Sequence, residues 1–303
     1  MKILVLGSIN IDYNYSVGHI TTPKETQAST AMEMFPGGKG MNQALALARA
    51  GMDVQLAAMI GPDGAETLEL IRQAGVDTSL VRTVDDRTGH AIIQVDEVGQ
   101  NAILLFAGAN HMIDEAYVDE VLAGYEEGDI LVLQNEISCL GYILERAYEK
   151  NMYIVFNPSP FTRDLPQLDL HKVSMFCLNE VEGRALTSYV QPGDILIQLE
   201  QQYPDSEFLF TLGAQGAFYK KKGEQYYQPS VSVPVVDATA AGDIFEGYFL
   251  ASHLKGKDPV ESMKYASYAA AYSIMHPGAA YFSAPTKEQV KAFIEGLKDC
   301  GRM

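Results

Sequence analysis

Short apolar runs alternate with helix-periodic segments along most of the chain. The first run, residues 3–6, is continuous and ends at Gly7, as in a parallel strand covered on both faces. From Val54 onward the alternation is regular. We predict strands at 54–60, 130–134, 153–156, 175–178 and 208–212, and helices at 64–74, 115–122, 140–149, 180–186 and 195–202. Strand followed by helix, repeated, predicts an α/β fold with a mostly parallel sheet and helices on both faces.

Four strand-like segments interrupt this alternation because no helix follows them directly. They are residues 13–17, 26–35, 90–96 and 101–106. Residues 97–100 between the last two are typical of a hairpin turn. We therefore expect a small sheet outside the main one, and a further hairpin region at 223–234. No repeat or interdomain linker divides the chain, so we expect a single domain over residues 1–303.

Composition and charge exclude several classes of protein. Hydrophobic residues make up 47% of the 303 residues, as in an ordinary globular chain, and the net charge is −17. Such an acidic surface argues against nucleic acid or an anionic membrane as partner. Cys139, Cys177 and Cys300 form no C-x-x-C pair, which favours a reducing, cytoplasmic location. The scattered histidines make a structural zinc site improbable, and no segment reaches the length of a membrane span.

The stretch from Val236 to Gly247 carries the strongest candidate chemistry. Its small residues lead into an apolar, helix-periodic segment, so we expect a helix to start near Gly242. The free amides of a first helical turn bind anions such as phosphate. Asp243 at this position either caps the helix or accepts a proton from a group that becomes phosphorylated. Taken alone, an aspartate at a helix start is more often a cap.

A second glycine-rich stretch, Gly37-Gly-Lys-Gly40, also opens a predicted helix. It is not a Walker A motif, which needs Ser or Thr after the lysine, and Gln43 excludes the G-x-G-x-x-G pattern. Without side chains at the glycines, a polyol ring could pack against the main chain, with Lys39 and Asn42 as donors. The alternative is a glycine-rich helix start with an exposed lysine.

Polar residues follow several predicted strands at the point where each strand ends. The pairs are Asn10 with Asp12, Asn135 with Glu136, Asn157 with Pro158, and Asn179 with Glu182. Each pair alone could serve as turn or cap residues. The carboxyl ends of parallel strands share one edge of a sheet, and ligands bind at that edge. The repetition of polar pairs after several strands therefore favours a binding site. Thr211, Gly213 and Gly216 likewise let the main chain approach a ligand, which we expect to be a nucleotide.

These motifs together resemble one family. Asp237-Ala-Thr-Ala-Ala-Gly-Asp243 resembles the C-terminal signature of the ribokinase-like (PfkB) carbohydrate kinases, and Pro36-Gly-Gly-Lys-Gly-Met-Asn-Gln-Ala44 resembles their N-terminal one. The likeness covers nearly the whole chain and is closest to the ribokinase subfamily. Further matching stretches are Gly7–Asp12, Gly108–Asn110, Leu133–Glu136, Asn157-Pro158, Asn179–Glu182 and Thr211–Gly216.

The resemblance implies a three-layer sandwich with a mostly parallel central sheet and a small β-sheet lid, formed by about residues 13–35 and 90–106. The lid would cover the sugar and pair with a second subunit in a homodimer. The implied reaction is ATP-dependent phosphorylation of a sugar hydroxyl, with ribose to ribose 5-phosphate expected. Asp243 would accept the hydroxyl proton, and the amides of Ala240, Ala241 and Gly242 would stabilise the transferred phosphoryl group.

The resemblance also implies a role for each group of ligand-binding residues. The sugar would contact Asn10, Asp12, Gly38, Lys39, Asn42, Glu136 and Asp243. ATP would contact Asn179, Thr211, Gly213, Gly216 and Gly242. Magnesium would lie near Asn179 and Glu182, through water. A monovalent cation, K⁺, would lie near Asp237, Thr239, Ser273, His276, Gly278 and Ser283.

Several departures from the ribokinase pattern keep alternatives open. Ala238 and His276 replace a usual Thr and Arg beside the K⁺ loop, which puts K⁺ activation in doubt. Met41 and Asn135 replace a usual Ala and Leu beside the other pocket, which puts the exact sugar in doubt, and Glu246 replaces a usual Asn. The rivals are a kinase for deoxyribose, another sugar or a nucleoside, and a sugar-binding regulator without catalysis. The intact Gly242-Asp243 pair argues against the regulator.

Overall fold

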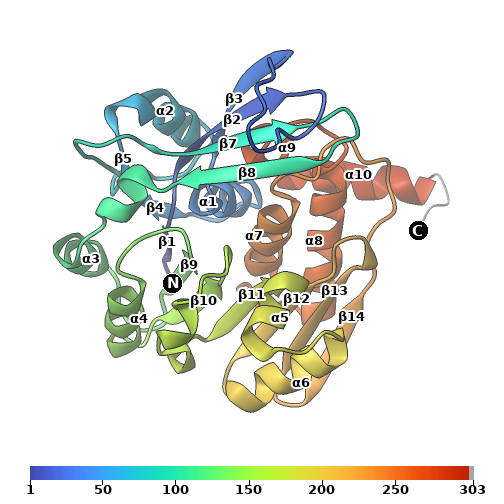
Figure 1. Cartoon of the computed structure of the whole chain (residues 1–303). Coiled ribbons are helices and arrows are strands. Elements are labelled where there is room, and N and C mark those ends of the chain that lie inside the picture. Colours follow the sequence, from blue (N-terminus) through green and yellow to red (C-terminus); the bar gives the residue numbers. More distant parts are fainter. Residues whose placement is uncertain (300–303) are drawn as a thin grey trace.

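The computed structural model describes residues 1–299, and Cys300 lies outside this range. An eight-stranded sheet forms the middle layer of three, with helices on both faces (Figure 1). In spatial order its strands are β14 (Glu224–Gln228), β13 (Ala217–Lys221), β12 (Glu207–Thr211), β11 (Met175–Asn179), β10 (Tyr153–Asn157), β9 (Ile130–Gln134), β1 (Ile3–Leu6) and β4 (Gln55–Ala57). The strands from β12 to β4 pair in parallel, and β13 and β14 extend the sheet antiparallel.

Two apolar cores hold the layers together. Ile3 and Val5 of β1 point into one core and Leu4 and Leu6 into the other, as the unbroken apolar run predicted. The first core is covered by α1 (Lys39–Arg49), α2 (Ala65–Gln73), α7 (Ala241–His253), α8 (Pro259–Ser273), α9 (Ala280–Ser283) and α10 (Lys287–Asp299). The second is covered by α3 (Glu115–Leu122), α4 (Leu140–Glu149), α5 (Glu180–Thr187) and α6 (Pro192–Gln202). The predicted three-layer α/β fold is confirmed.

The small sheet that we predicted outside the main one is also present. Its order is β3 (Ala31–Gly37), β2 (Asn10–Ser16), β7 (Gly89–Val95) and β8 (Asn101–Phe106). β2 pairs parallel with β7, although hairpins join the other neighbours antiparallel. β2 starts four residues after β1, so residues at the end of β1 and the start of β2 connect the two sheets (Figure 1).

Two element predictions were wrong in their boundaries. The apolar run 54–60 is two strands: β4 joins the main sheet, whereas β5 (Met59–Ile60) pairs with β6 (Arg82–Thr83) in a separate sheet. An apolar run indicates burial but not the strand with which each part pairs. The hairpin expected at 223–234 is formed earlier, by β13 and β14. Lys222 and Gly223 have φ of 46° and 85°, which is the left-handed pair that a tight two-residue turn requires.

The order of the sheet locates a crevice. β1 lies between β4 and β9, so the connections leaving β1 and β9 run to opposite sides of the sheet. Ligands of open α/β sheets bind at the carboxyl ends of strands where the order reverses in this way. Asn10 follows β1 and Glu136 follows β9 at this edge. Within residues 1–299, the helices are too short or too polar to cross a membrane.

Candidate active site

The N-terminus of α7 has the form of an anion-binding turn. Its N-cap, Ala240, is left-handed with φ of 60° and offers no side-chain cap, and Gly242 is exposed. We expected three free amides here, but the Ala241 N–H donates to the Ala238 carbonyl at 3.2 Å. The amides of Ala240 and Gly242 have no acceptor within the described part of the chain, and they remain available to an anion.

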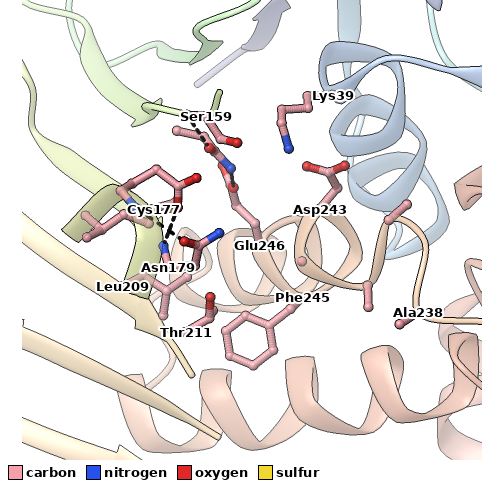
Figure 2. Close-up of a pocket in the computed structure, with 16 residues that line it drawn as sticks. Lys39, Ser159, Cys177, Asn179, Leu209, Thr211, Ala238, Asp243, Phe245 and Glu246 are labelled. Atoms are coloured by element: carbon pink, nitrogen blue, oxygen red, sulfur yellow. Dashed lines mark hydrogen bonds between the residues drawn. The ribbon is translucent and has the colours of Figure 1, made fainter. Parts of the chain in front are cut away.

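Asp243 is not a helix cap, which removes the simpler of the two interpretations of the sequence. Its side chain is 7% exposed and is held by two consecutive residues of α1. Asn42 Nδ2 donates to Oδ2 at 3.0 Å and Gln43 Nε2 donates to Oδ1 at 3.1 Å. Lys39 Nζ points toward the same carboxylate (Figure 2). The negative charge of Asp243 raises the pKa of Lys39, although burial opposes it, so the lysine stays charged.

Glu136 ties the start of α1 to the end of β9. Its Oε2 accepts the backbone N–H of Lys39 at 3.0 Å and the hydroxyl of Ser8. Burial raises the pKa of Glu136, and the positive charge of Lys39 opposes that rise. Gly38 has φ of 94°, and a Cβ there would lie 2.9 Å from Asn10 N, so only glycine fits between β2 and α1.

Asn10 and Asp12 lie on β2 beside this group. Asn10 Oδ1 accepts Asn110 Nδ2 at 2.8 Å, which fixes the orientation of its amide. A Cβ at Gly37 would lie 2.1 Å from Asp12 Oδ2, so the glycine makes room for the carboxyl. Burial and the charge of Glu136 raise the pKa of Asp12 to about 7. The predicted sugar-binding residues therefore form one connected cluster.

Two cavities meet at the start of α7. The first, of about 250 Å³, is polar, and Lys39, Asn179, Glu182 and Asp243 line it (Figure 2). The second, of about 460 Å³, is mostly apolar and is lined by Thr211, Gly213, Gly216 and residues of α8. The residues that line both cavities are Thr211, Ala238, Ala241, Gly242 and Phe245. A ligand with an apolar ring and an anionic tail would fill both, with its tail at the free amides.

Asn179 and Glu182 form a capping box at the start of α5. Asn179 Oδ1 accepts the N–H of Val181 at 2.7 Å, and Glu182 Oε2 accepts the N–H of Asn179 at 3.0 Å. Both residues also line the polar cavity, so the cap does not remove them from the candidate site. Residues 1–299 contain no group of three His, Cys, Asp or Glu side chains that could cage a metal. One carboxylate beside an anion site fits Mg²⁺, which keeps waters and binds through phosphate.

The residues expected near a monovalent cation come from two loops that touch and from the ends of α8 and α9. Asp237 Oδ2 accepts the N–H of Gly278 at 2.9 Å, and Asp237 Oδ1 accepts the N–H of Thr239 at 2.8 Å. The hydroxyl of Ser273 donates to the Ala270 carbonyl, and that of Ser283 donates to the Ala279 carbonyl. His276 stacks on Tyr272, with ring centroids 4.5 Å apart, and its Nδ1 lies 2.8 Å from the Tyr272 carbonyl.

Sequence reasoning missed a mostly buried polar group behind Asp243. It consists of Gln43, Gln134, Asn157, Cys177 and Glu246, which come from α1, β9, β10, β11 and α7. We singled out Asn157 as a strand-end residue and Glu246 as a departure from the family pattern, but assigned neither to the site. Gln43 and Gln134 gave no usable signal, because a glutamine at a helix or strand position is unremarkable until its partners are known.

Comparison with known proteins agrees with this geometry. Residues 1–287 match the profile of the pfkB family carbohydrate kinases. The chain is 34% identical over 300 residues to a ribokinase from Haemophilus influenzae, covering 96% of this chain and 97% of the relative. It is 27% identical over 303 residues to a deoxyribokinase from Salmonella typhimurium, covering 97% and 99%.

Two solved structures are similar over the same length. A ribokinase from Cryptococcus neoformans in complex with ADP is 34% identical with a TM-score of 0.83, covering 96% of this chain and 99% of that one. A ribokinase from Arabidopsis thaliana complexed with ribose and ATP is 26% identical with a TM-score of 0.80, covering 97% and 98%. Because the family profile spans almost all of the sequence and both signature stretches converge on Asp243, the chain belongs to the pfkB family of carbohydrate kinases.

Proposed function

We propose that this protein transfers the γ-phosphoryl group of ATP to ribose and forms ribose 5-phosphate. One observation carries the proposal. The buried Asp243 carboxylate contacts the side-chain amides of Asn42 and Gln43, and it lies beside the free backbone amide of Gly242 where the two cavities meet. A base and an anion site then lie side by side, as phosphoryl transfer to a hydroxyl requires.

In the reaction, Asp243 accepts the proton of the attacking hydroxyl as the new oxygen–phosphorus bond forms. The bond between the γ-phosphorus and the bridging oxygen breaks, and ADP leaves. The amides of Ala240 and Gly242 and the charge of Lys39 stabilise the negative charge on the transferred group. These donors are preorganised, because the helix start and the neighbours of Asp243 already hold them in position.

The apolar cavity supports adenine binding, and the polar cavity supports the phosphates. Thr211, Gly213 and Gly216 line the apolar cavity, and Asn179 and Glu182 line the polar cavity. Asn179 and Glu182 would hold Mg²⁺ through water, and the bound ion would supply positive charge to neutralise the phosphates. The contact between the Asp237 and Gly278 loops supports a K⁺ site there, and this part of the proposal is tested by replacing K⁺ with Na⁺.

Asn10, Asp12 and Glu136 support recognition of a sugar with adjacent hydroxyls. Carboxylates accept hydrogen bonds from such hydroxyls, and the Asn10 Nδ2 group, oriented by Asn110, can donate to them. A 2-deoxy sugar would leave one of these polar groups unpaired beneath the bound sugar, which a hydrogen-bonding site discriminates against strongly. The substrate-binding role of Gly38 is to let the ring approach the main chain. ATP is a cytoplasmic substrate, so we expect the enzyme to act in the cytoplasm.

The small sheet supports the role of a lid that forms a homodimer. A cross-strand row of Met34, Tyr13, Ile92 and Leu104 lies on the face opposite to Asp12. Met34, Ile92 and Leu104 are 59%, 39% and 68% exposed. A contiguous apolar face of this kind is unusual on a monomer, and a second copy of the same face would cover it.

The test is an ADP-release assay over ribose, 2-deoxyribose, hexoses and nucleosides, with Mg²⁺ and with either K⁺ or Na⁺. We expect a clear preference for ribose. Turnover of another compound instead would reject ribose but keep the kinase, and would direct attention to Met41 and Asn135. No turnover with any compound would support the non-catalytic regulator.

A further inference from the structure

Glu246 is a second buried carboxyl beside the reacting carboxylate. It follows Asp243 by three residues on α7, so both side chains project from the same side of the helix (Figure 2). Its side chain is 2% exposed. A buried acid so close to Asp243 is costly unless hydrogen bonds satisfy it, and the proposed reaction gives it no role.

A single amide joins the two carboxyl groups. Gln43 Nε2 donates to Asp243 Oδ1 and to Glu246 Oε2, each at 3.1 Å. Gln134 Nε2 donates to Gln43 Oε1 at 2.6 Å. Turning the Gln43 amide around would place its oxygen against both carboxyl groups and its nitrogen against the nitrogen of Gln134. Only one orientation of Gln43 therefore satisfies its neighbours.

The surrounding packing holds this group in one arrangement in the wild type. Gln43 and Gln134 are fully buried, and a Cβ at Gly7 would lie 2.1 Å from Gln134 Oε1. Asn157 Nδ2 donates to Glu246 Oε2 at 2.9 Å. Glu246 Oε2 therefore accepts two amides, one from α1 and one from β10. Its Oε1 is buried and has no hydrogen-bond partner in the portion of the chain that the structure describes.

An unpartnered Oε1 suits a neutral carboxylic acid rather than a carboxylate. Burial raises the pKa of Glu246 to about 8, and the charge of Asp243 adds to the rise. The Asn157 hydrogen bond and the charge of Lys39 oppose this rise in pKa. The buried thiol of Cys177 on β11 opposes it as well. A neutral Glu246 accepts hydrogen bonds without placing a second negative charge beside Asp243.

We propose that Glu246 is a positioning residue that acts through Gln43, holding the Gln43 amide so that it orients the Asp243 carboxylate toward the substrate hydroxyl. Gln43 and Asn42 occupy one lone pair on each oxygen of Asp243, which leaves the others directed to the cavity and Lys39. Without Glu246, one hydrogen of the Gln43 amide would be buried and unpaired, and the amide would turn away. This inference rests on the proposed function, because it assigns Asp243 as the base.

The kinetic test compares substitutions at both ends of this contact. Glu246→Met and Gln43→Met keep the volume but remove the hydrogen bonds. Each should lower kcat about tenfold or more and change KM for sugar and ATP less than about threefold, because an orientation effect is confined to the reacting group. Glu246→Gln, which mimics a neutral acid, should keep kcat within about threefold of wild type.

The double variant separates positioning from general destabilisation. If Glu246 acts through Gln43, the kcat of the double Met variant should match that of Gln43→Met alone. Multiplied losses would overturn the proposal, and so would a Glu246→Gln variant as impaired as Glu246→Met. Glu200→Met is the matched control, because it removes a part-buried glutamate that pairs with Lys220 away from the site and should not change kcat. If Glu246→Met does not fold, Glu246→Ser replaces it.

A crystal structure of Glu246→Met is a readout that does not depend on turnover. We expect the Gln43 amide and the Asp243 carboxylate to rotate relative to wild type. Unchanged side chains at both positions would overturn the inference even if the wild-type protein proved inactive. Wild-type turnover in the ADP-release assay tests the proposed function separately, so the two failures are distinguishable.

Discussion

At the scale of single residues, the site depends on carboxyl groups whose surroundings differ. Asp243 has two amide donors and a facing lysine, which suits an ionised base. Asp12 is half-buried beside Glu136, and its pKa of about 7 lets its charge change near neutral pH. A carboxyl group can thus serve as a general base or as a hydrogen-bond acceptor for the sugar, according to its neighbours.

Asp243→Asn should abolish most turnover while the fold and ATP binding are kept. An amide of the same shape cannot accept the proton, and loss of a general base costs about 100-fold or more in kcat. Stopped assays for kcat, with thermal melting and nucleotide titration as controls, measure this. A kcat near wild type would remove Asp243 from the role of base.

Sugar affinity should increase as the pH rises from 6 to 8. The Asp12 carboxyl is mostly protonated below its pKa of about 7 and becomes a stronger acceptor of sugar hydroxyls above it. We expect KM for the sugar to fall severalfold over this range while KM for ATP does not follow the same curve. Asp12→Asn should raise the sugar KM and remove its pH dependence; a flat profile in the wild type would contradict this role.

At the scale of elements, α7 is fixed at both ends by contacts with different functions. Its N-terminus carries the candidate site, and its C-terminus is anchored through His253, whose Nε2 lies 3.1 Å from Glu207 Oε2 at the start of β12. Lys221 of β13 donates to Glu207 Oε1 at 2.6 Å, and Tyr219 donates to Oε2. Glu207 thus connects two strands and a helix at the edge of the sheet opposite to the active site.

Glu207→Gln should lower the melting temperature in a pH-dependent way. Burial alone would raise the pKa of Glu207, but hydrogen bonds from His253, Lys221 and Tyr219 outweigh it and lower the pKa to about 2. The stabilisation is therefore complete above the ordinary value of 4.5 and is lost as the pH falls to about 2. We expect a cost of roughly 2 kcal/mol at pH 7.

Melting curves of the wild type and Glu207→Gln between pH 2 and 7 measure this difference. The difference in melting temperature between the two proteins should become smaller below pH 4.5 and disappear near pH 2. A gap that stays constant over the whole range would contradict the charge-based account. Glu69→Gln is the control, because Glu69 pairs with Arg72 on an exposed helix face and such pairs contribute little.

At the scale of the whole molecule, the two faces of the small sheet carry different groups: Asp12 lies on one face, and an exposed apolar row lies on the other. The register places Asp12 beside Phe35 and Ala91, and places Tyr13 beside Met34 and Ile92 on the opposite face. Because strand side chains alternate, the proposed recognition of the sugar and the proposed association of two copies would use different residues of the same strand. If the proposed lid and dimer form, β2 would connect the sugar to the contact between the two copies.

Replacing Met34 and Leu104 together with glutamate should convert a dimer to a monomer. Two charges per copy would face their symmetry partners in an apolar contact. Sedimentation should give about twice the 33.2 kDa chain mass for wild type and the single mass for the variant. Val98→Glu, at the exposed hairpin turn of the same sheet, is the control and should remain dimeric. A monomeric wild type would reject the lid dimer.

Much of the architecture was determined by the sequence alone. Unbroken apolar runs bounded by glycine and polar residues predicted the buried parallel strands, because burial on both faces leaves no other pattern. Asp243 and the glycine stretches could be identified locally, since a helix start and a close main-chain approach need small residues at fixed spacing. The capping box at Asn179 and Glu182 is likewise a short-range signal.

Only the tertiary structure decided which distant polar residues meet. Gln43 and Asp243 are separated by 200 residues, and Gln43 and Gln134 by 91, so no local pattern relates them. The division of 54–60 between two sheets and the parallel pairing of β2 with β7 also depend on partners far along the chain. A residue type specifies what hydrogen bonds a side chain can make, but the packed fold alone specifies with whom it makes them.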